Sequence, residues 1–159
     1  MSQRRENMAT STEIEEKAVD SPLPWVREHI DQYLASDGAE VDFPMRENLI
    51  LLYTRGRKTG QIRRVAVMQY PDGEDLVLIA SKGGAPEHPA WYLNLHDDPR
   101  VWVRQKSEVF PAMASDLDGE EYQTMWGRVT DWNPGFQEYQ DNTERRLPLV
   151  RLQRVEEHD

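Results

Sequence analysis

A short cationic stretch is the first feature of the sequence whose residue types could do chemistry. The chain holds 19 Lys and Arg against 29 Asp and Glu, yet residues 49–64 contain no acidic residue at all. The charge of this stretch is +5, between −6 over residues 1–48 and −9 over residues 65–159. Its basic residues are Arg55, Arg57, Lys58, Arg63 and Arg64. Such segregation indicates a local anion site, with charge protection of a hairpin edge as the alternative.

Two glycine-containing turns could take part in binding such an anion. Gly56–Gly60, of sequence GRKTG, offers backbone N–H groups, a threonine hydroxyl and two cations, which suit a monophosphate or carboxylates. It lies between predicted strands and lacks the GxxxxGK[ST] pattern, so it does not indicate a nucleotide triphosphatase. Ser81–Gly84, of sequence SKGG, precedes a predicted helix, whose N-terminus favours an anion. Each motif alone also occurs as a plain turn.

Several other chemistries are excluded by what the chain lacks. It contains no Cys, which excludes a disulfide framework, thiolate metal sites and a cysteine nucleophile. Its four His form no HExxH pattern and no serine lies in GxSxG, so metal and serine hydrolase chemistry are not expected. The net charge of −10 argues against nucleic acid as a partner. Without an apolar stretch long enough for a signal peptide or a membrane span, a cytoplasmic protein is expected.

The elements that must position the two turns follow from apolar periodicity. Residues 1–20 are polar, acidic and without such periodicity, which predicts a disordered tail before a single domain over residues 21–159. Leu23 to Leu34 show helical spacing, which predicts an amphipathic helix of about 13 residues packed on the core. Residues 49–54, 62–70 and 76–80 are predicted strands, and their short connections require them to be antiparallel.

The remaining chain is predicted to add three helices and three strands. These are a helix opened by Pro89 and ended by Asp97–Pro99, strands over residues 100–104 and 109–114, a helix to about Thr130 with Ser115 and Asp118 as its capping box, a short helix capped by Asn133, and a strand over residues 147–155. Six antiparallel strands with peripheral helices predict an α+β fold built on a small closed or split β-barrel. Side chains fill barrels of this size, so a ligand is expected outside or at a rim.

Four ordered motifs also carry a resemblance to a known family. They are Gly56–Gln61, Ser81–Ala85, His88–Leu95 and Thr143–Pro148. In order and spacing they resemble the deazaflavin-dependent nitroreductases and the F420-dependent quinone reductases, over about residues 49–152. The resemblance implies an FMN-binding split-barrel-like fold, in agreement with the six strands predicted independently from periodicity.

The resemblance implies coenzyme F420 as the cofactor, with FMN less favoured. By similarity, Arg57, Lys58 and Thr59 would hold its phosphate and glutamyl tail, with Arg63 and Lys82 nearby. The deazaflavin ring would be flanked by Arg64, Val65, Ala66, Val67, Met68, Ile79, Ala80 and Ser81, and covered by Ala90, Trp91, Tyr92, Leu93 and Asn94.

The activity implied is hydride transfer from the reduced deazaflavin to a flat electrophile such as a quinone, a nitroaromatic or an activated enone. Asn133, Phe136 and Tyr139 would face this acceptor. Phe136 would also face the ring and has no proton to donate, so Tyr139 is the candidate catalytic residue, with water as the alternative.

Three questions stay open at this point. The same fold could serve a non-catalytic F420 carrier, or bind FMN or haem instead. A monomer and a dimer are equally compatible with the sequence. Peripheral contact of the first helix with the inner face of the plasma membrane is neither required nor excluded, because its polar face carries both acidic and basic residues.

Overall fold

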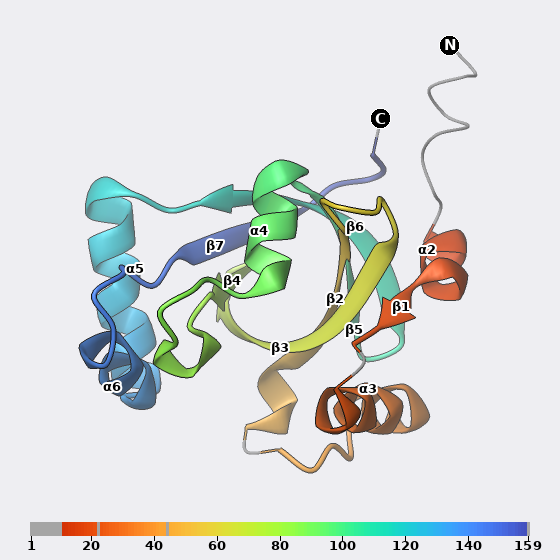
Figure 1. Cartoon of the computed structure of the whole chain (residues 1–159), viewed down its shortest axis with the longest axis horizontal. Helices are drawn as coiled ribbons and strands as arrows, with labels where there is room; N and C mark the ends of the chain where they lie inside the picture. The colour runs from red at the N-terminus through yellow and green to blue at the C-terminus, as the bar shows by residue number, and fades with distance from the viewer. Residues whose placement is uncertain (1–10, 22, 44, 159) are drawn as a thin grey trace.

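Six strands close into an antiparallel barrel in the computed structural model, which describes residues 11–21, 23–43 and 45–158 (Figure 1). They are β2 (Leu49–Arg55), β3 (Ile62–Asp72), β4 (Asp75–Ile79), β5 (Arg100–Gln105), β6 (Glu108–Asp116) and β7 (Leu149–Arg154). The order is β3-β2-β5-β6-β7-β4, and pairing of β3 with β4 closes the ring. The predicted fold class is therefore confirmed.

Strand β3 closes the barrel because it pairs with two different strands along its length. Its residues 62–68 pair with β2, and its residues 69–72 pair with β4. The partner changes between Met68 and Gln69, so the outer face of residues 65–68 lies where the two parts of the sheet meet. This is the stretch of β3 beside which the functional pocket lies.

The strands are apolar on both faces because helices cover the barrel from outside. Along β2, Ile50 and Leu52 point into the barrel core, whereas Leu49, Leu51 and Tyr53 pack in a second cluster beneath helix α3 (Pro24–Ser36). Burial on both faces gives a continuous apolar run in place of the alternation of a half-exposed strand.

The other helices cover further surfaces of the barrel. Helix α4 (Ala90–Asp97) contributes Tyr92 and Leu95 to the barrel core. Helices α5 (Gly119–Trp132) and α6 (Gly135–Asp141) pack over the outer side of β4 and β7. Two single 3-10 turns, η1 (Arg46–Asn48) and η2 (Lys82–Gly84), connect the elements near the pocket. No helix within the described residues is long and apolar enough to cross a membrane.

The predicted capping box at the start of α5 is wrong. Ser115 belongs to β6 and pairs with Arg151 of β7, and the helix begins only at Gly119. Asp118 is its N-cap residue, without a side-chain hydrogen bond. The local pattern fitted a cap, but the ladder between β6 and β7 keeps this segment extended through Asp116.

The predicted disordered tail is also wrong for residues 11–20. Helix α2 (Ser11–Lys17) buries Ile14 completely, and β1 (Val19–Asp20) adds a parallel seventh strand beside β3. Arg64 of β3 holds this segment through Asp20, at 2.7 Å, and Glu15, at 3.2 Å. The segment is held by one buried apolar residue, Ile14, and by two ion pairs to a distant residue. Such contacts produce no periodic apolar pattern, so the sequence did not reveal an ordered segment. The rest of the predicted tail, residues 1–10, lies outside the described residues.

Candidate functional site

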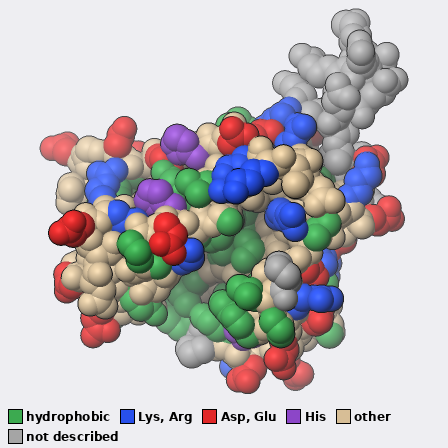
Figure 2. Space-filling view, viewed as in Figure 1, with side chains coloured by type: hydrophobic (Ala, Val, Ile, Leu, Met, Phe, Trp, Pro, Cys, Tyr) green, Lys and Arg blue, Asp and Glu red, His purple; other side chains and the backbone are tan. Residues whose placement is uncertain are grey.

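A pocket of about 460 Å³ lies outside the barrel, against the outer part of β3 and the end of β4. Figure 2 shows a hollow with a hydrophobic interior, and Lys and Arg side chains gather over the β2–β3 turn beside it. The predicted site residues that line the pocket are Val65, Ala66, Val67, Met68, Ile79, Ser81, Lys82, Trp91, Asn133, Phe136 and Tyr139. The fold thus brings together residues that are widely separated in the chain.

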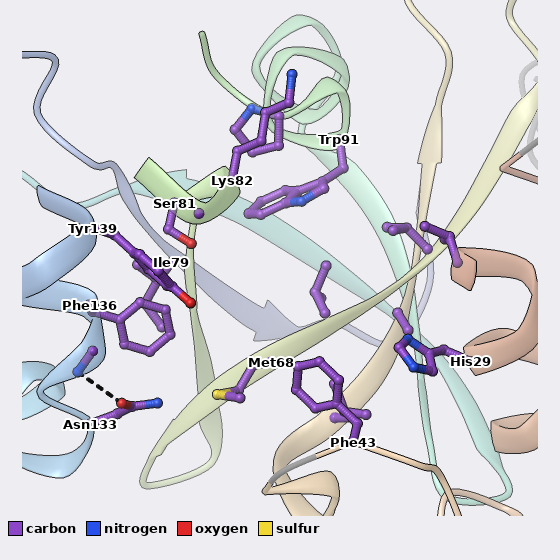
Figure 3. A pocket seen from close by; sticks show the side chains of 18 of the residues that line it. His29, Phe43, Met68, Ile79, Ser81, Lys82, Trp91, Asn133, Phe136 and Tyr139 are labelled. Carbon is purple, nitrogen blue, oxygen red and sulfur yellow. Dashed lines mark hydrogen bonds between the residues drawn. The ribbon is translucent and has the colours of Figure 1, made fainter. Parts of the chain in front are cut away.

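The strand residues form one apolar side of the pocket. Ala66 contributes only a methyl group, next to Val65 and Met68, and Ile79 continues this surface from β4. Trp91, at the start of α4, borders the same space from another side (Figure 3). A planar, largely apolar group fits such a surface, and the volume is within the roughly 300–1,000 Å³ of small-molecule sites.

Helix α6 forms the aromatic side of the pocket. Phe136 is buried, whereas Tyr139 is 39 % exposed, and their rings meet edge to face at 6.0 Å. Figure 3 shows both side chains on the same side of the pocket. Tyr139 therefore lines the pocket with a partly exposed side chain.

Asn133 stands where α6 begins, with its polar atoms already bonded. Its Oδ1 accepts a hydrogen bond from the Gly135 backbone N–H at 3.1 Å, and its Nδ2 lies 3.6 Å from Met45 Sδ. These contacts fix the entry to the helix and join it to the loop before β2. Asn133 lines the pocket, but part of its hydrogen-bonding capacity serves the fold.

Four pocket residues from α3 and the following loop were missed by sequence reasoning, namely Trp25, Val26, His29 and Phe43. Trp25, His29 and Phe43 lie opposite α6, and the imidazole of His29 meets the Trp25 and Phe43 rings edge to face at 6.1 and 5.5 Å. Figure 3 shows His29 and Phe43 across the pocket from Tyr139 and Phe136. Trp25 and His29 share one helical flank, i to i+4, and this spacing was the available signal.

The Ser81–Ala85 turn enters the pocket through residues in the left-handed region of the backbone. Lys82, Gly83 and Gly84 have φ angles of 47°, 64° and 83°. A Cβ at Gly84 would lie 2.7 Å from the Tyr139 carbonyl oxygen, so the turn and α6 touch through backbone. Lys82 Nζ pairs with Glu87 Oε1 at 2.9 Å, and both side chains are exposed.

Arg145 holds this turn from behind and was not singled out by sequence reasoning. Its guanidinium donates to the backbone carbonyls of Ala80, Ser81 and Ala85 and contacts His88 Nδ1. Desolvation by burial lowers the pKa of Arg145 from its usual value. Burial, and after it the neighbouring Arg145, lower the pKa of His88. The sequence signal was the fourth motif, Thr143–Pro148, in which no residue had an assigned role.

The basic turn between β2 and β3 does not line the pocket but is hydrogen-bonded to α4, the helix whose Trp91 does line it. Asn94, in α4, is buried, and its Oδ1 accepts hydrogen bonds from Arg57 N at 3.2 Å and Arg57 Nη1 at 3.0 Å. Its Nδ2 donates to Thr54 Oγ1 at 3.2 Å. Asn94 therefore holds the basic turn to the helix that carries Trp91, instead of lining the pocket itself.

The structure divides the cationic stretch into two groups. Within the described residues, no carboxylate lies within 4.0 Å of Arg57, Lys58 or Arg63. Arg57, Lys58 and Thr59 are exposed at the tip of the turn. Arg64, predicted to lie near a cofactor, is instead neutralised by Asp20 and Glu15, with a side chain only 11 % exposed. It is committed to the N-terminal segment.

The other predicted residues of this region support the site from outside the pocket. Ala80 is fully buried, and Leu93 packs against the barrel core. Tyr92 is buried, and its hydroxyl donates to Asp116 Oδ2 at 2.7 Å. Ala90 is exposed at the first turn of α4 and does not line the pocket. Within residues 11–158, apart from 22 and 44, no cluster of three or more His, Asp or Glu could hold a metal ion.

Comparison with known proteins identifies relatives of this chain. A family model described as "F420H(2)-dependent quinone reductase" matches residues 25–154. A Mycobacterium tuberculosis protein of that name is 34 % identical over 108 residues, which cover 66 % of this chain and 72 % of the relative. A solved F420-H2 dependent reductase is 34 % identical with a TM-score of 0.61, covering 67 % of this chain and 94 % of that one. A structure described as a domain-swapped dimer, also 34 % identical, has a TM-score of 0.63 and covers 84 % of this chain and 100 % of that one.

Proposed function

We propose that this chain, which belongs to the F420H(2)-dependent quinone reductase family, reduces a quinone with a hydride from reduced coenzyme F420. F420 is the cofactor that the family name implies, and the chain is accordingly an oxidoreductase. The quinone acceptor is the part that the family suggests for this chain and that the site must support.

The residues present fit the cofactor in both of its parts. The deazaflavin is planar and largely apolar, and the pocket side formed by Val65–Met68 and Ile79 has the same character. The phosphate and glutamyl tail are anionic, and Arg57, Lys58 and Thr59 offer exposed cations and a hydroxyl. When bound in its reduced form, F420 supplies the hydride, and the protein supplies orientation.

The acceptor would lie between the aromatic sides of the pocket. Phe136 and Tyr139 from α6 face His29 and Phe43 across the pocket, and Trp25 contacts the His29 ring. These rings can align a flat electrophile and exclude water from it. Conversion of a quinone to a quinol consumes one hydride and one proton. Tyr139 lines the pocket and is 39 % exposed, and we assign to its hydroxyl the donation of that proton, followed by reprotonation from solvent.

One observation carries the proposal furthest. The exposed cations of the basic turn have no carboxylate partner among the described residues, and Asn94 fastens this turn to the helix that brings Trp91 to the pocket. An anion-binding element therefore adjoins an apolar, aromatic pocket. A cofactor with a flat ring and an anionic tail requires this combination.

Turnover of reduced F420 with menadione tests the proposal. Addition of the protein should restore the absorbance of oxidised F420, and the double variant Arg57→Ala/Lys58→Ala should raise the Kd for F420 by roughly 10- to 100-fold. The matched control Lys17→Ala/Arg128→Ala removes two exposed cations elsewhere and should leave the Kd unchanged.

Titration with F420 beside FMN separates the alternatives. Tight F420 binding without reduction of any quinone, nitroaromatic or enone would contradict an enzyme and indicate a carrier. Preferential binding of FMN or haem would contradict the cofactor assignment. Reduction of nitroaromatics or enones but not of quinones would retain the enzyme and overturn the acceptor.

A further inference from the structure

The Ser81–Ala85 turn has a backbone conformation that is disfavoured without outside support. Lys82, Gly83 and Gly84 are three consecutive residues with positive φ, and Lys82 bears a side chain that disfavours this region. Ser81, Lys82 and Gly83 all line the pocket, so the shape of the pocket depends on this conformation. Support from outside the turn is therefore needed.

Arg145 supplies that support through several backbone contacts. Its Nη2 donates to Ser81 O at 2.7 Å, its Nε to Ala85 O at 2.8 Å and its Nη1 to Ala80 O at 3.1 Å. The same Nη1 lies 3.0 Å from His88 Nδ1. The guanidinium thus bridges both ends of the turn, which a planar group with five donors can do and a single ammonium cannot.

The segment that carries Arg145 is in turn tied to α6. Gln140 Nε2 donates to Arg145 O at 2.8 Å, and Gln140 Oε1 accepts from Leu147 N at 2.9 Å. Helix α6 also touches Gly84 through the Tyr139 carbonyl. The position of the turn relative to the aromatic side of the pocket is therefore set through Arg145 and its segment.

The charge of Arg145 distinguishes it from an ordinary structural ion pair. In the part of the chain that the structure describes, no carboxylate lies within 4.0 Å of its guanidinium, and its partners are carbonyl oxygens and an imidazole. Arg145 does not line the pocket. Its direct contacts near the pocket are therefore with the turn and its flanking residues, not with a ligand in the pocket.

We propose that Arg145 is a positioning residue of the F420 site, which holds the Ser81–Ala85 turn in its binding conformation and at its correct distance from α6. This inference rests on the proposed function for the identity of the ligand. The stability of the turn can be measured in the cofactor-free protein. The role of Arg145 and the proposed function can therefore be disproved independently of each other.

Hydrogen exchange of the cofactor-free protein tests the first half of the inference. In Arg145→Ala, the amides of Gly84 and Ala85, which donate to Ser81 O and Lys82 O, should exchange at least about tenfold faster, while those of the barrel strands stay protected. The matched control Arg146→Ala removes the neighbouring cation, which lies over the Tyr122 ring, and should leave exchange in the turn unchanged. Unchanged exchange in the turn of Arg145→Ala would overturn the inference.

Equilibrium binding tests the second half. The Kd for F420, followed by fluorescence, should rise roughly 10- to 100-fold in Arg145→Ala and less than about threefold in Arg146→Ala. Arg145→Lys should recover only part of the affinity, because one ammonium cannot reach carbonyls at both ends of the turn. Full affinity in Arg145→Ala would overturn the assignment.

Chemical rescue separates positioning from a general loss of stability. Guanidinium at about 20 mM should restore much of the F420 affinity and the slow exchange of Arg145→Ala, whereas equal ammonium or sodium chloride should not. Equal recovery with ammonium or sodium would contradict the bridging role. Should Arg145→Ala fail to fold, the same measurements on Arg145→Lys decide the question. Failure of the wild-type protein to bind F420 would instead overturn the proposed function.

Discussion

Basic residues close together in the chain have different roles because their neighbours differ. Arg64 lies among Asp20, Glu15 and the Tyr53 ring, which fix it as part of the N-terminal contact. Arg57 and Lys58 are exposed on a turn, without a carboxylate partner among the described residues. Their charges are therefore available to an anionic ligand. Residue type predicted a cationic site, and only the contacts showed which cations belong to it.

The role of Tyr139 gives the first prediction. Tyr139→Phe removes the hydroxyl group but keeps the aromatic ring that contacts Phe136. We expect kcat for quinone reduction to fall roughly 10²-fold, because proton donation is lost, while the Kd for F420 stays unchanged. Steady-state kinetics with saturating F420H2 measure the first quantity, and fluorescence titration measures the second.

Tyr70→Phe is the matched control for this substitution. Tyr70 lies on β3 against the Trp132 ring and does not line the pocket. Its variant should keep the wild-type kcat. An unchanged kcat in Tyr139→Phe would show that water or another group delivers the proton.

The environment of His88 gives a second prediction, on pH. Burial, then Arg145 and His96, lower the pKa of His88, against the opposing effect of Asp116. The unfolded chain therefore binds a proton more readily than the folded protein. The stability that depends on neutral His88 is present above the unfolded pKa of 6.5 and is lost as the pH falls through it toward the folded value.

Urea unfolding at several pH values checks this expectation. Between about pH 8 and pH 5, the wild-type protein should lose more stability than His88→Gln, because the variant lacks this titration. Parallel pH profiles for the two proteins would contradict the assignment.

At the scale of elements, the site depends on how closely the Ser81–Ala85 turn and α6 approach each other. Gly84 is the contact point: its φ is 83°, and a Cβ there would lie 2.7 Å from the Tyr139 carbonyl oxygen. Gly83 has a φ of 64°, but no described atom lies within 4 Å of a Cβ placed on it. A side chain at Gly83 would therefore meet only the unfavourable backbone conformation, whereas a side chain at Gly84 would also collide with α6.

This pair gives a third prediction. Gly83→Ala should destabilise the protein by about 1 kcal/mol through the left-handed φ alone, and Gly84→Ala by about 3 kcal/mol or more, because the turn must also move away from α6. Urea denaturation measures both values. Equal losses in the two variants would contradict a tight contact at Gly84, and the F420 Kd should rise more in Gly84→Ala.

The elements that sequence reasoning located best are those with local determinants. Strands β2, β3 and β4 follow from apolar runs and the short turns between them. The segment α2–β1 was missed because its attachment depends on Arg64, far away in the chain. The capping box failed at Ser115 because pairing with β7 outweighs a local preference. Long-range contacts decided both cases.

For the whole molecule, the uneven distribution of charge matters more than its sum. The net charge is −10, yet residues 49–64 carry +5. Exposed cations without a carboxylate partner in the described part of the chain provide a favourable local region for an anion on this acidic protein. The attraction between an anion and such exposed groups is screened by salt. The strength of cofactor binding should therefore depend on ionic strength.

This gives a fourth prediction. Raising the salt concentration from about 0.05 M to 0.5 M should increase the Kd for F420 roughly three- to tenfold in the wild-type protein. The double variant Arg57→Ala/Lys58→Ala should show a much smaller dependence, because it lacks the cations being screened. A Kd independent of salt in the wild type would contradict binding of the anionic tail at this turn.

The sequence by itself determined the barrel, the basic turn and the aromatic residues of α6, because short turns, apolar runs and local charge are properties of neighbouring residues. Tertiary structure decided which of these residues meet. It brought α3 opposite α6 across the pocket and paired Arg64 with Asp20 and Glu15. It also hydrogen-bonded Arg145 to the backbone carbonyls of the Ser81–Ala85 turn. Such contacts join residues far apart in the chain, and closure of the barrel between β3 and β4 sets their distances.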